Sequence, residues 1–350
     1  TVLHAGRRPS RDATVVALLR SAGAVLMGKT VCTELGLVAP GRTRNPHDPR
    51  RTPGGSSSGS AAAVAAEMVP LATGSQNNGS VIRPASYCGV YGYKPTSGRI
   101  SRHGALRQSP SLDQIGVFGR TVEDVALLAQ ELMTFDPMDE AMRPAARDTL
   151  LDCVRQEPPA APRLAFVKTP VWDQAADTTR TAIEQLVARL SGHIGEVSLP
   201  PIFASAHAIH KTLMEPELAV NYAAEYATGK ERLSATLCQI IERGRTAAAI
   251  DYLGAQKQVP RLAEALDELL AEYDAILTPA TPSEAPAGLG STGSPIFCTI
   301  WTLCGVPTIS MPLLRGADGM PLGIQLVGRR GDDARLLRTA RWLAAFAPCS

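Results

Sequence analysis

The chain has 350 residues and a formal net charge of +2 at pH 7, from 35 lysines and arginines against 33 aspartates and glutamates. Hydrophobic residues make up 45% of the sequence and charged residues 19%, which is the composition of a globular protein with a sizeable core. This near balance of charge argues against a protein held to nucleic acid or to a membrane surface by electrostatic attraction.

The sequence predicts neither a membrane span nor a disulfide framework. No apolar run approaches the roughly 18 residues that cross a bilayer, and no secretory signal follows Thr1. The seven cysteines are odd in number and scattered, and none forms a C-x-x-C pair, so a zinc ribbon is not predicted either. We therefore expect a cytoplasmic protein with no metal and no cofactor.

In chain order, the first part alternates short helices and strands with loops rich in glycine and proline. Helices are predicted over residues 12–22, 60–66 and 122–133. Strands are predicted over residues 24–27, 68–72 and 89–93. Residues 35–59 form a predicted loop, and a second Gly-rich loop covers 74–80.

The second part begins with residues 135–162, which are acidic, Pro-rich and aperiodic and therefore predict a surface excursion. Strands are predicted over residues 164–167, 196–199, 275–278, 306–312 and 322–327. Helices are predicted over residues 178–190 and 333–346, with a helical insert over 203–272. Strands that alternate with helices favour an α/β fold: a single large mixed, mostly parallel twisted sheet, covered by helices on both faces.

Residues 23–30, GAVLMGKT, satisfy the phosphate-binding pattern G-x-x-x-x-G-K-[ST]. That site needs a strand before the first glycine, a flexible loop and a following helix. Here a helix precedes Gly23, the four variable residues are apolar, and the residues after Thr30 are poor helix formers. A nucleotide-binding protein stays an alternative that these surroundings disfavour.

Residues 55–59, GSSSG, match the nucleophile elbow G-x-S-x-G with Ser57 at its centre. The lead-in DPRRTPG cannot be the buried strand that such an elbow needs, so a Ser-His-Asp triad is disfavoured. His207 and His210 stand three residues apart, upstream of Glu215 and Glu217, but lack the H-E-x-x-H pattern of a zinc site. We favour histidines that are satisfied on a helix face.

Three segments occur together: GKT at 28–30, PGGSSSGSAAA at 53–63 and GSQNNGSVIRPASYCGVYGYKPTSGRIS at 74–101. In this order and spacing they resemble the amidase signature family, and the similarity runs from about residue 12 to residue 128. It weakens through 135–275 and returns in DAILTP and GVPTISMP near 274 and 305. The resemblance implies the amidase signature fold in one domain over residues 1–350, with its core in 12–134 and 163–350.

The resemblance also implies a Ser–Ser–Lys catalytic set. Lys29 takes the role of base, Ser56 stands in a cis peptide unit as a proton relay, and Ser80 is the nucleophile. The oxyanion hole falls to backbone N–H groups of Asn77, Asn78, Gly79 and Ser80. Substrate-binding candidates are Gly55 and Trp301, whereas Lys94 and Asp113 match family positions that we interpret as scaffold.

These residue types suit the chemistry. A serine hydroxyl is a weak nucleophile and needs a base within hydrogen-bond reach. A lysine serves only when neutral, and burial lowers its pKa because desolvation disfavours the ammonium form, whereas an arginine cannot lose its proton. Only six of the 35 cationic residues are lysines. We therefore expect Lys29 to be buried beside both hydroxyls.

The sequence departs from the family pattern at several positions. Asn78-Gly79 stands where Gly-Gly is common, Gln76 replaces an aspartate, and Arg83 lies three rather than two residues after the nucleophile. A neutral hydrogen bond of Gln76 should then replace an ion pair. The resemblance also implies a further N-terminal segment that contributes helices and a sheet strand, and we expect either that this segment is absent before residue 1 or that its strand is replaced.

The expected activity is serine-dependent hydrolysis of amide C–N bonds through an acyl-enzyme intermediate. A carbamate (urethane) or urea-type hydrolase would use the same residues, and a glutaminase-type amidotransferase subunit is a further alternative. A catalytically inactive binding protein also stays open because of Asn78. The expected partner is a small-molecule amide or carbamate, with no nucleic acid, no membrane and a possible homodimer.

Overall fold

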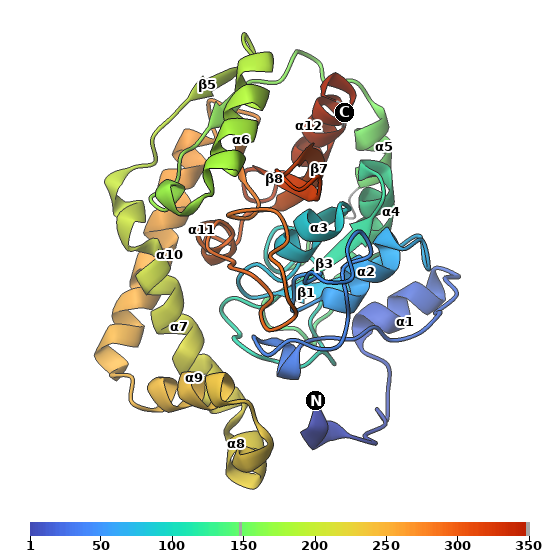
Figure 1. Cartoon of the computed structure of the whole chain (residues 1–350), viewed down its shortest axis with the longest axis vertical. Helices are drawn as coiled ribbons and strands as arrows, with labels where there is room; N and C mark the ends of the chain where they lie inside the picture. The colour runs from blue at the N-terminus through green and yellow to red at the C-terminus, as the bar shows by residue number, and fades with distance from the viewer. Residues whose placement is uncertain (147–148, 348–350) are drawn as a thin grey trace.

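The computed structural model describes residues 1–146 and 149–347, and Figure 1 shows a central sheet surrounded by helices. The sheet has eight strands in the order β1-β3-β2-β7-β8-β6-β4-β5. The strands are β1 (Ala72–Gln76), β2 (Tyr91–Lys94), β3 (Gln114–Gly119), β4 (Leu164–Phe166), β5 (Ile194–Glu196), β6 (Ala275–Pro279), β7 (Thr308–Arg315) and β8 (Pro321–Val327).

The predicted mixed sheet is confirmed, but the expectation that it is mostly parallel is wrong. Among the described residues, β4 pairs in parallel with β5 and with β6, and every other neighbouring pair is antiparallel. The chain connections explain this difference. Residues 316–320 form a tight turn between β7 and β8, and a turn of this length can join only antiparallel strands.

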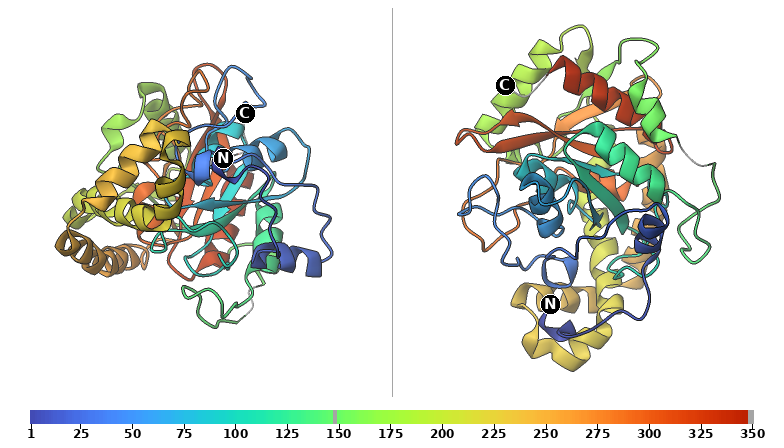
Figure 2. Two further views of the ribbon diagram at one scale, coloured as in Figure 1. Left: turned by 90° about the horizontal axis from the view of Figure 1, so that it is seen from below. Right: turned by 90° about the vertical axis from the view of Figure 1, so that its right-hand side faces the viewer.

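Helices cover both faces of the sheet, as predicted, and the side views of Figure 2 show both layers. One face carries α4 (Val122–Leu132), α5 (Leu150–Arg155), α6 (Asp177–Arg189) and α12 (Asp333–Phe346). The other carries α2 (Ser58–Ala65), α3 (Ile82–Cys88), α7 (Ala206–Asn221), α10 (Ala249–Leu269) and α11 (Thr299–Leu303). The remaining helices are α1 (Thr14–Ser21), α8 (Ala223–Gly229) and α9 (Ala235–Arg245).

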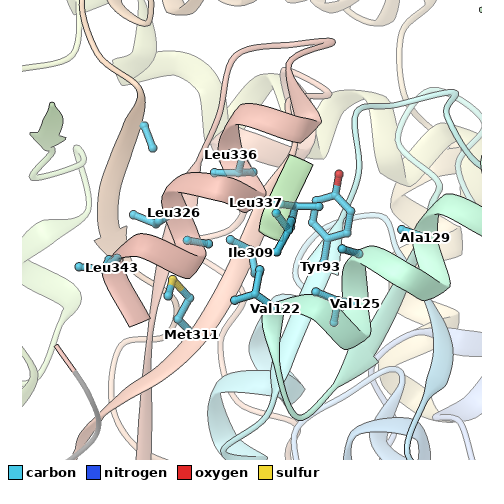
Figure 3. Close-up of a cluster of buried hydrophobic side chains, with 14 of the residues drawn as sticks. Tyr93, Val122, Val125, Ala129, Ile309, Met311, Leu326, Leu336, Leu337 and Leu343 are labelled. Carbon is cyan, nitrogen blue, oxygen red and sulfur yellow. The ribbon is translucent and has the colours of Figure 1, made fainter. Parts of the chain in front are cut away.

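The larger core lies between the sheet and the layer of α4 and α12 (Figure 3). Ile309 and Met311 alternate along β7 and point to the same face, as the two-residue repeat of a strand requires. Val125 of α4 and Leu337 of α12 pack against them from the helical side. This core packs against one face of the sheet. The candidate site lies on the other face.

Helix prediction was accurate where an apolar face repeats over several turns. The helix over 333–346 is confirmed at both ends as α12, and those over 12–22, 60–66, 122–133 and 178–190 correspond to α1, α2, α4 and α6. The insert 203–272 is helical, with α7 to α10 forming an arm along one side of the sheet (Figure 1).

Other predicted elements are shifted or wrong. The strand expected over 68–72 lies over 72–76 as β1, and α3 and β3 were not predicted. Residues 24–27 form no strand; every residue from 21 to 32 is exposed. The stretch 135–162 contains α5, whose buried Leu150 and Val154 pack in the main core. Residues 147–148 of this stretch, and Cys349, lie outside the described residues.

No helix within residues 1–146 and 149–347 combines the length and the apolar character that crossing a bilayer requires.

Candidate active site

Two glycine-containing loops meet on the face of the sheet that carries α2 and α3. One loop leads into α2 and contains Ser56, which is 1% exposed; the other joins β1 to α3 and contains Ser80, 6% exposed. The N–H of Ser57 donates to the carbonyl oxygen of Ser80 at 3.4 Å, so the two loops are in contact. The Gly55–Ser56 peptide is cis, as the resemblance implies.

The serines of the first loop differ in what their hydroxyls contact. The Ser57 hydroxyl accepts from the N–H of Ser75 at 3.2 Å and donates to the Ser75 carbonyl at 3.3 Å, which ties it to β1. Ser58 and Ser60 likewise donate to backbone carbonyls. Ser56 instead has its hydroxyl beside the thiol of Cys32. Ser57 is therefore engaged in structural contacts, which agrees with the rejection of the nucleophile elbow.

The N–H groups of residues 77–80 have no backbone acceptor among the described residues. The carbonyl groups of Asn77 and Asn78, in contrast, are both held by hydrogen bonds. The Asn77 carbonyl accepts from Nε2 of His210 at 2.8 Å, and the Asn78 carbonyl accepts from the Thr302 hydroxyl at 2.5 Å. Unengaged N–H groups on an anchored loop are the arrangement that can stabilise a developing oxyanion.

Asn78 and Gly79 are both accommodated by neighbouring residues of the C-terminal half. Asn78 Oδ1 accepts from the Thr299 hydroxyl of α11 at 2.8 Å, so its side chain is held away from the loop. A Cβ at Gly79 would lie 2.8 Å from Cβ of Pro295, so only glycine fits there. The hydrogen bond to α11 thus holds the Asn78 side chain that the sequence places beside Gly79.

Gln76 forms the expected neutral hydrogen bonds, although none of them involves Arg83. Its Oε1 accepts from the N–H groups of Val81 and Ile82 at 2.8 and 3.0 Å, and its Nε2 donates to the Thr302 hydroxyl at 2.9 Å. The amide therefore caps the start of α3, where helix N–H groups lack intrahelical acceptors. This position requires an acceptor that an uncharged side chain can supply.

The expectation that Lys29 is buried is wrong. Its side chain is exposed, and within the described part of the chain no hydrogen bond or ion pair reaches its Nζ. The neighbouring Val25 and Met27 are 83% and 74% exposed, and in the described part of the chain this segment belongs to no helix or strand. The structure thus brings together Ser56, Ser80 and the N–H groups of 77–80, but not Lys29.

Of the two substrate-binding candidates, Gly55 directly precedes Ser56 in its loop, whereas Trp301 is packed into the core. A Cβ at Gly55 would lie 2.8 Å from Cγ2 of Thr292, so this residue is closely packed against the loop that precedes α11. Trp301 is fully buried in the core cluster beneath α7 and α10. Its role as a pocket wall stays a prediction that its packing does not favour.

Lys94 and Asp113 make the contacts of scaffold residues. Lys94 Nζ donates to Gln114 Oε1 and to the Val306 carbonyl, both at 2.6 Å, and burial lowers its pKa to about 7. Asp113 accepts from the N–H groups of Gln108 and Ser109, and burial raises its pKa to about 7. Neither contacts a serine of the site.

Sequence reasoning missed several residues that hold the site together: Cys32, His210, Thr299 and Thr302. All but Cys32 lie more than a hundred residues from the loop they contact, so no local pattern could connect them to it. His207 and His210 were expected to be satisfied on a helix face, and each donates from Nε2 to a carbonyl, Ile296 and Asn77 respectively.

We expect replacement of His210 by phenylalanine to lower kcat by about tenfold with little change in KM, because the N–H groups of 77–80 lose a fixed orientation. His207→Phe is the matched control, since it removes an equivalent bond to the Ile296 carbonyl rather than to the loop. Steady-state kinetics of both variants test this. Equal losses in the two would show a general effect of α7 instead.

His210 also gives a pH prediction for stability. Burial lowers its pKa to about 4 from the usual 6.5, so between these values the unfolded chain takes up a proton that the folded protein does not. The stability that His210 contributes is therefore complete above about pH 6.5 and is lost as the pH falls towards 4. Urea unfolding over this range should show a weaker pH dependence in His210→Phe than in the wild type. Parallel profiles would contradict the buried, neutral state.

Comparison with known proteins places this site in a family. The family model described as Amidase matches residues 1–337, and the chain belongs to the amidase signature family. The site residues described above lie within the matched range. The chain is thus a member of a family of enzymes, with an α/β fold that its relatives share.

Its relatives include both amidotransferase subunits and amidohydrolases. It is 33% identical to a glutamyl-tRNA(Gln) amidotransferase subunit of Koribacter versatilis, over 94% of this chain and 76% of that protein. The corresponding subunit of Thermus thermophilus is 35% identical over 95% of this chain and 77% of that protein. A solved 6-aminohexanoate cyclic dimer hydrolase with bound substrate superposes with a TM-score of 0.88 at 27% identity, covering 99% of this chain and 80% of the hydrolase.

Proposed function

We propose that this chain hydrolyses the C–N bond of small amides, with Ser80 as the nucleophile. The observation that carries the proposal is the loop 77–80: its N–H groups donate to no described residue, and the carbonyl of its serine accepts from the N–H of Ser57, the residue after Ser56. The similarity to a 6-aminohexanoate cyclic dimer hydrolase supports a hydrolytic function. Hydrolysis of a linear amide by this route needs a nucleophile, a general base with a path for the proton, an oxyanion site and water.

In the proposed reaction, Ser80 Oγ attacks the amide carbonyl carbon, and its proton passes through Ser56 to Lys29, the base that the resemblance implies. The carbonyl oxygen becomes an oxyanion that accepts hydrogen bonds from the N–H groups of 77–80. The C–N bond then breaks as the nitrogen takes a proton back through Ser56. Water hydrolyses the acyl ester on Ser80, releasing an acid and restoring the hydroxyl.

A fluorophosphonate probe tests the nucleophile directly. Such a probe reacts with a serine that is activated and lies beside an oxyanion site, so peptide mapping should find it on Ser80. Pre-incubation with an amide substrate should slow the labelling. Label on Ser57 instead, or no label on a folded protein, would refute the assignment.

Lys29 is the base that the resemblance implies, and it needs its own test because its side chain is exposed. Lys29→Met should lower kcat by about 10²-fold or more if its amine takes the Ser80 proton. Lys257→Met, at an exposed lysine of α10, is the control and should leave kcat unchanged. Wild-type turnover in Lys29→Met would remove Lys29 from the mechanism and leave Ser80, Ser56 and the oxyanion loop in place.

The relatives favour a second candidate function, a glutaminase-type amidotransferase subunit. Relatives at 33–36% identity are named as glutamyl-tRNA(Gln) amidotransferase subunits. Ammonia release from free glutamine by the isolated chain would support it, and lack of release together with turnover of simple amides would favour the hydrolase.

A panel of amides, anilides, ureas and carbamates, with product detection, separates an amidase from a urethanase.

A further inference from the structure

A layer of buried polar side chains lies on the face of the sheet that carries the candidate site. Tyr93 of β2 and Ile309 of β7 point into the main core (Figure 3), so their neighbours Lys94 and Thr308 point to the opposite face. Lys94 is fully buried and is the one buried lysine in the described part of the chain. A cation in the interior is costly unless its protons are donated to acceptors.

Gln114 of β3 connects this lysine to α11. Its Oε1 accepts from Lys94 Nζ at 2.6 Å, and its Nε2 donates to the carbonyls of Leu112 and Thr302, both at 3.2 Å. An ammonium group only donates hydrogen bonds, so the charged Lys94 determines which end of the Gln114 amide faces Thr302. The backbone of Thr302 is therefore held by a side chain that Lys94 orients.

Thr302 in turn holds the loop 77–80. Its hydroxyl donates to the Asn78 carbonyl at 2.5 Å and accepts from Gln76 Nε2 at 2.9 Å. Gln76 directly precedes the loop, and its Oε1 accepts from the N–H groups of the two residues that follow Ser80. The loop is thus held at its middle and at both ends by contacts that lead to Thr302.

We propose that Lys94 is a positioning residue for the loop 77–80 and acts on it through Gln114 and Thr302. This inference rests on the proposed amide hydrolysis at Ser80, because the loop has a catalytic role only in that reaction. Lys94 contacts neither serine of the site. Its contribution is to keep the N–H groups of the loop in the orientation that a developing oxyanion requires.

The protonation state of Lys94 decides whether this set of contacts is complete. The charged amine has three protons for three acceptors, which are Gln114 Oε1 and the carbonyls of Val306 and Pro95. The neutral amine has two protons and a lone pair, so one acceptor loses its donor. Of the three, only the Gln114 amide can rotate to donate to the amine. That rotation turns Oε1 towards the Thr302 carbonyl, to which it cannot bond.

Burial lowers the pKa of Lys94 to about 7, so this change falls near neutral pH. The ionisable groups around the amine are Asp333 of α12, Arg330 after β8, and the thiols of Cys298 and Cys304 at the two ends of α11. Asp333 favours the charged amine and Arg330 opposes it. Burial raises the pKa of both thiols to about 12, so neither changes its charge near pH 7.

The test compares two buried threonines. Thr302→Val removes the hydroxyl that holds the Asn78 carbonyl and keeps the shape of the side chain. Thr308→Val is the matched control, because the Thr308 hydroxyl is equally buried, has no described partner and lies opposite Lys94 on β7. In amide hydrolysis, kcat should fall by about tenfold in Thr302→Val with little change in KM, and by less than about twofold in Thr308→Val. Thr302→Ser, which keeps the hydroxyl, should recover most of the loss.

The pH profile of kcat tests the connection to Lys94 without replacing this buried residue. In the wild type, kcat should contain a component that falls as the pH rises through about 7, where Lys94 loses its proton. Thr302→Val should lack this component, whereas Thr308→Val should keep it. Asp113 also has a pKa of about 7, but it bonds the N–H of Gln108 rather than Thr302, so the effect of its titration should be the same in every variant.

Three results would overturn the proposal. One is a Thr302→Val variant with the kcat of the wild type. Another is an equal loss of kcat in Thr302→Val and Thr308→Val, which would show a general effect of disturbing the buried layer. The third is a pH profile that is the same in the wild type and in Thr302→Val. In all three, fluorophosphonate labelling of Ser80 and turnover persist, so the proposed function stands. Absence of labelling and of all turnover in the wild type would refute the proposed function itself.

Discussion

Replacement of Ser80 by alanine should lower kcat for amide hydrolysis by about 10⁴-fold or more, since no other group can form the acyl intermediate. The fold should be unaffected, because the Ser80 hydroxyl donates to no described residue. Steady-state kinetics with a thermal unfolding curve measure both effects. With an activated ester, which acylates the enzyme faster than water deacylates it, the wild type should show a burst of product in the first turnover and Ser80→Ala should show none.

Ser86 in the helix that follows, α3, provides the matched control. Its hydroxyl is within 3.0 Å of the Thr281 hydroxyl and accepts from the Gly323 N–H at 2.9 Å, so it joins α3 to β8. Ser86→Ala should therefore lower the free energy of unfolding by about 1–3 kcal/mol and leave kcat unchanged. If Ser80→Ala retained turnover while Ser86→Ala abolished it, the nucleophile would have to be sought elsewhere.

The secondary structure that could be predicted is the part whose signal is local. Helix α4 begins with a capping box, in which Thr121 and Asp124 bond each other's backbone, and continues with an apolar face. For α12, the apolar positions repeat over four turns. These signals need no information about neighbours, which is why both helices were predicted within a residue or two.

A strand forms only where a neighbouring strand provides hydrogen bonds, and the wrong predictions of secondary structure are mostly predictions of strands. The apolar residues 68–72 predicted a strand, but β1 is formed by the small and polar residues of 72–76, because they pair with β3. Residues 24–27 have the composition of a strand and no strand beside them in the described chain. A sequence shows which residues favour extended backbone, not which of them find a hydrogen-bonding neighbour.

The same limit applies to the site. Ser56 and Ser80 could be assigned because their motifs are contiguous, and the structure places them in touching loops. His210 and Thr302 act on the loop 77–80 from far along the chain, so their contribution is visible only after folding. For Lys29, the motif gave a residue type and a position, but burial depends on what packs against the segment, which no motif encodes.

Ser56 and Ser57 offer a test of the relay at two adjacent buried hydroxyls. Ser57 is bonded to both backbone groups of Ser75, so Ser57→Ala should cost about 1 kcal/mol of stability and leave kcat nearly unchanged. Ser56 has no such contact to β1 and neighbours the Ser80 loop, so Ser56→Ala should lower kcat by about 10²–10⁴-fold with little effect on stability. Kinetics and unfolding of both variants should therefore give opposite patterns.

The choice of leaving group sharpens this test of Ser56. If Ser56 carries the proton of Ser80, its removal should slow acylation by an amide more than acylation by an activated ester, whose leaving group needs no proton. Amide turnover should then fall much further than ester turnover in Ser56→Ala. Equal losses on both substrates would instead mean that Ser56 holds the loop before α2 in place, rather than returning a proton to the leaving nitrogen.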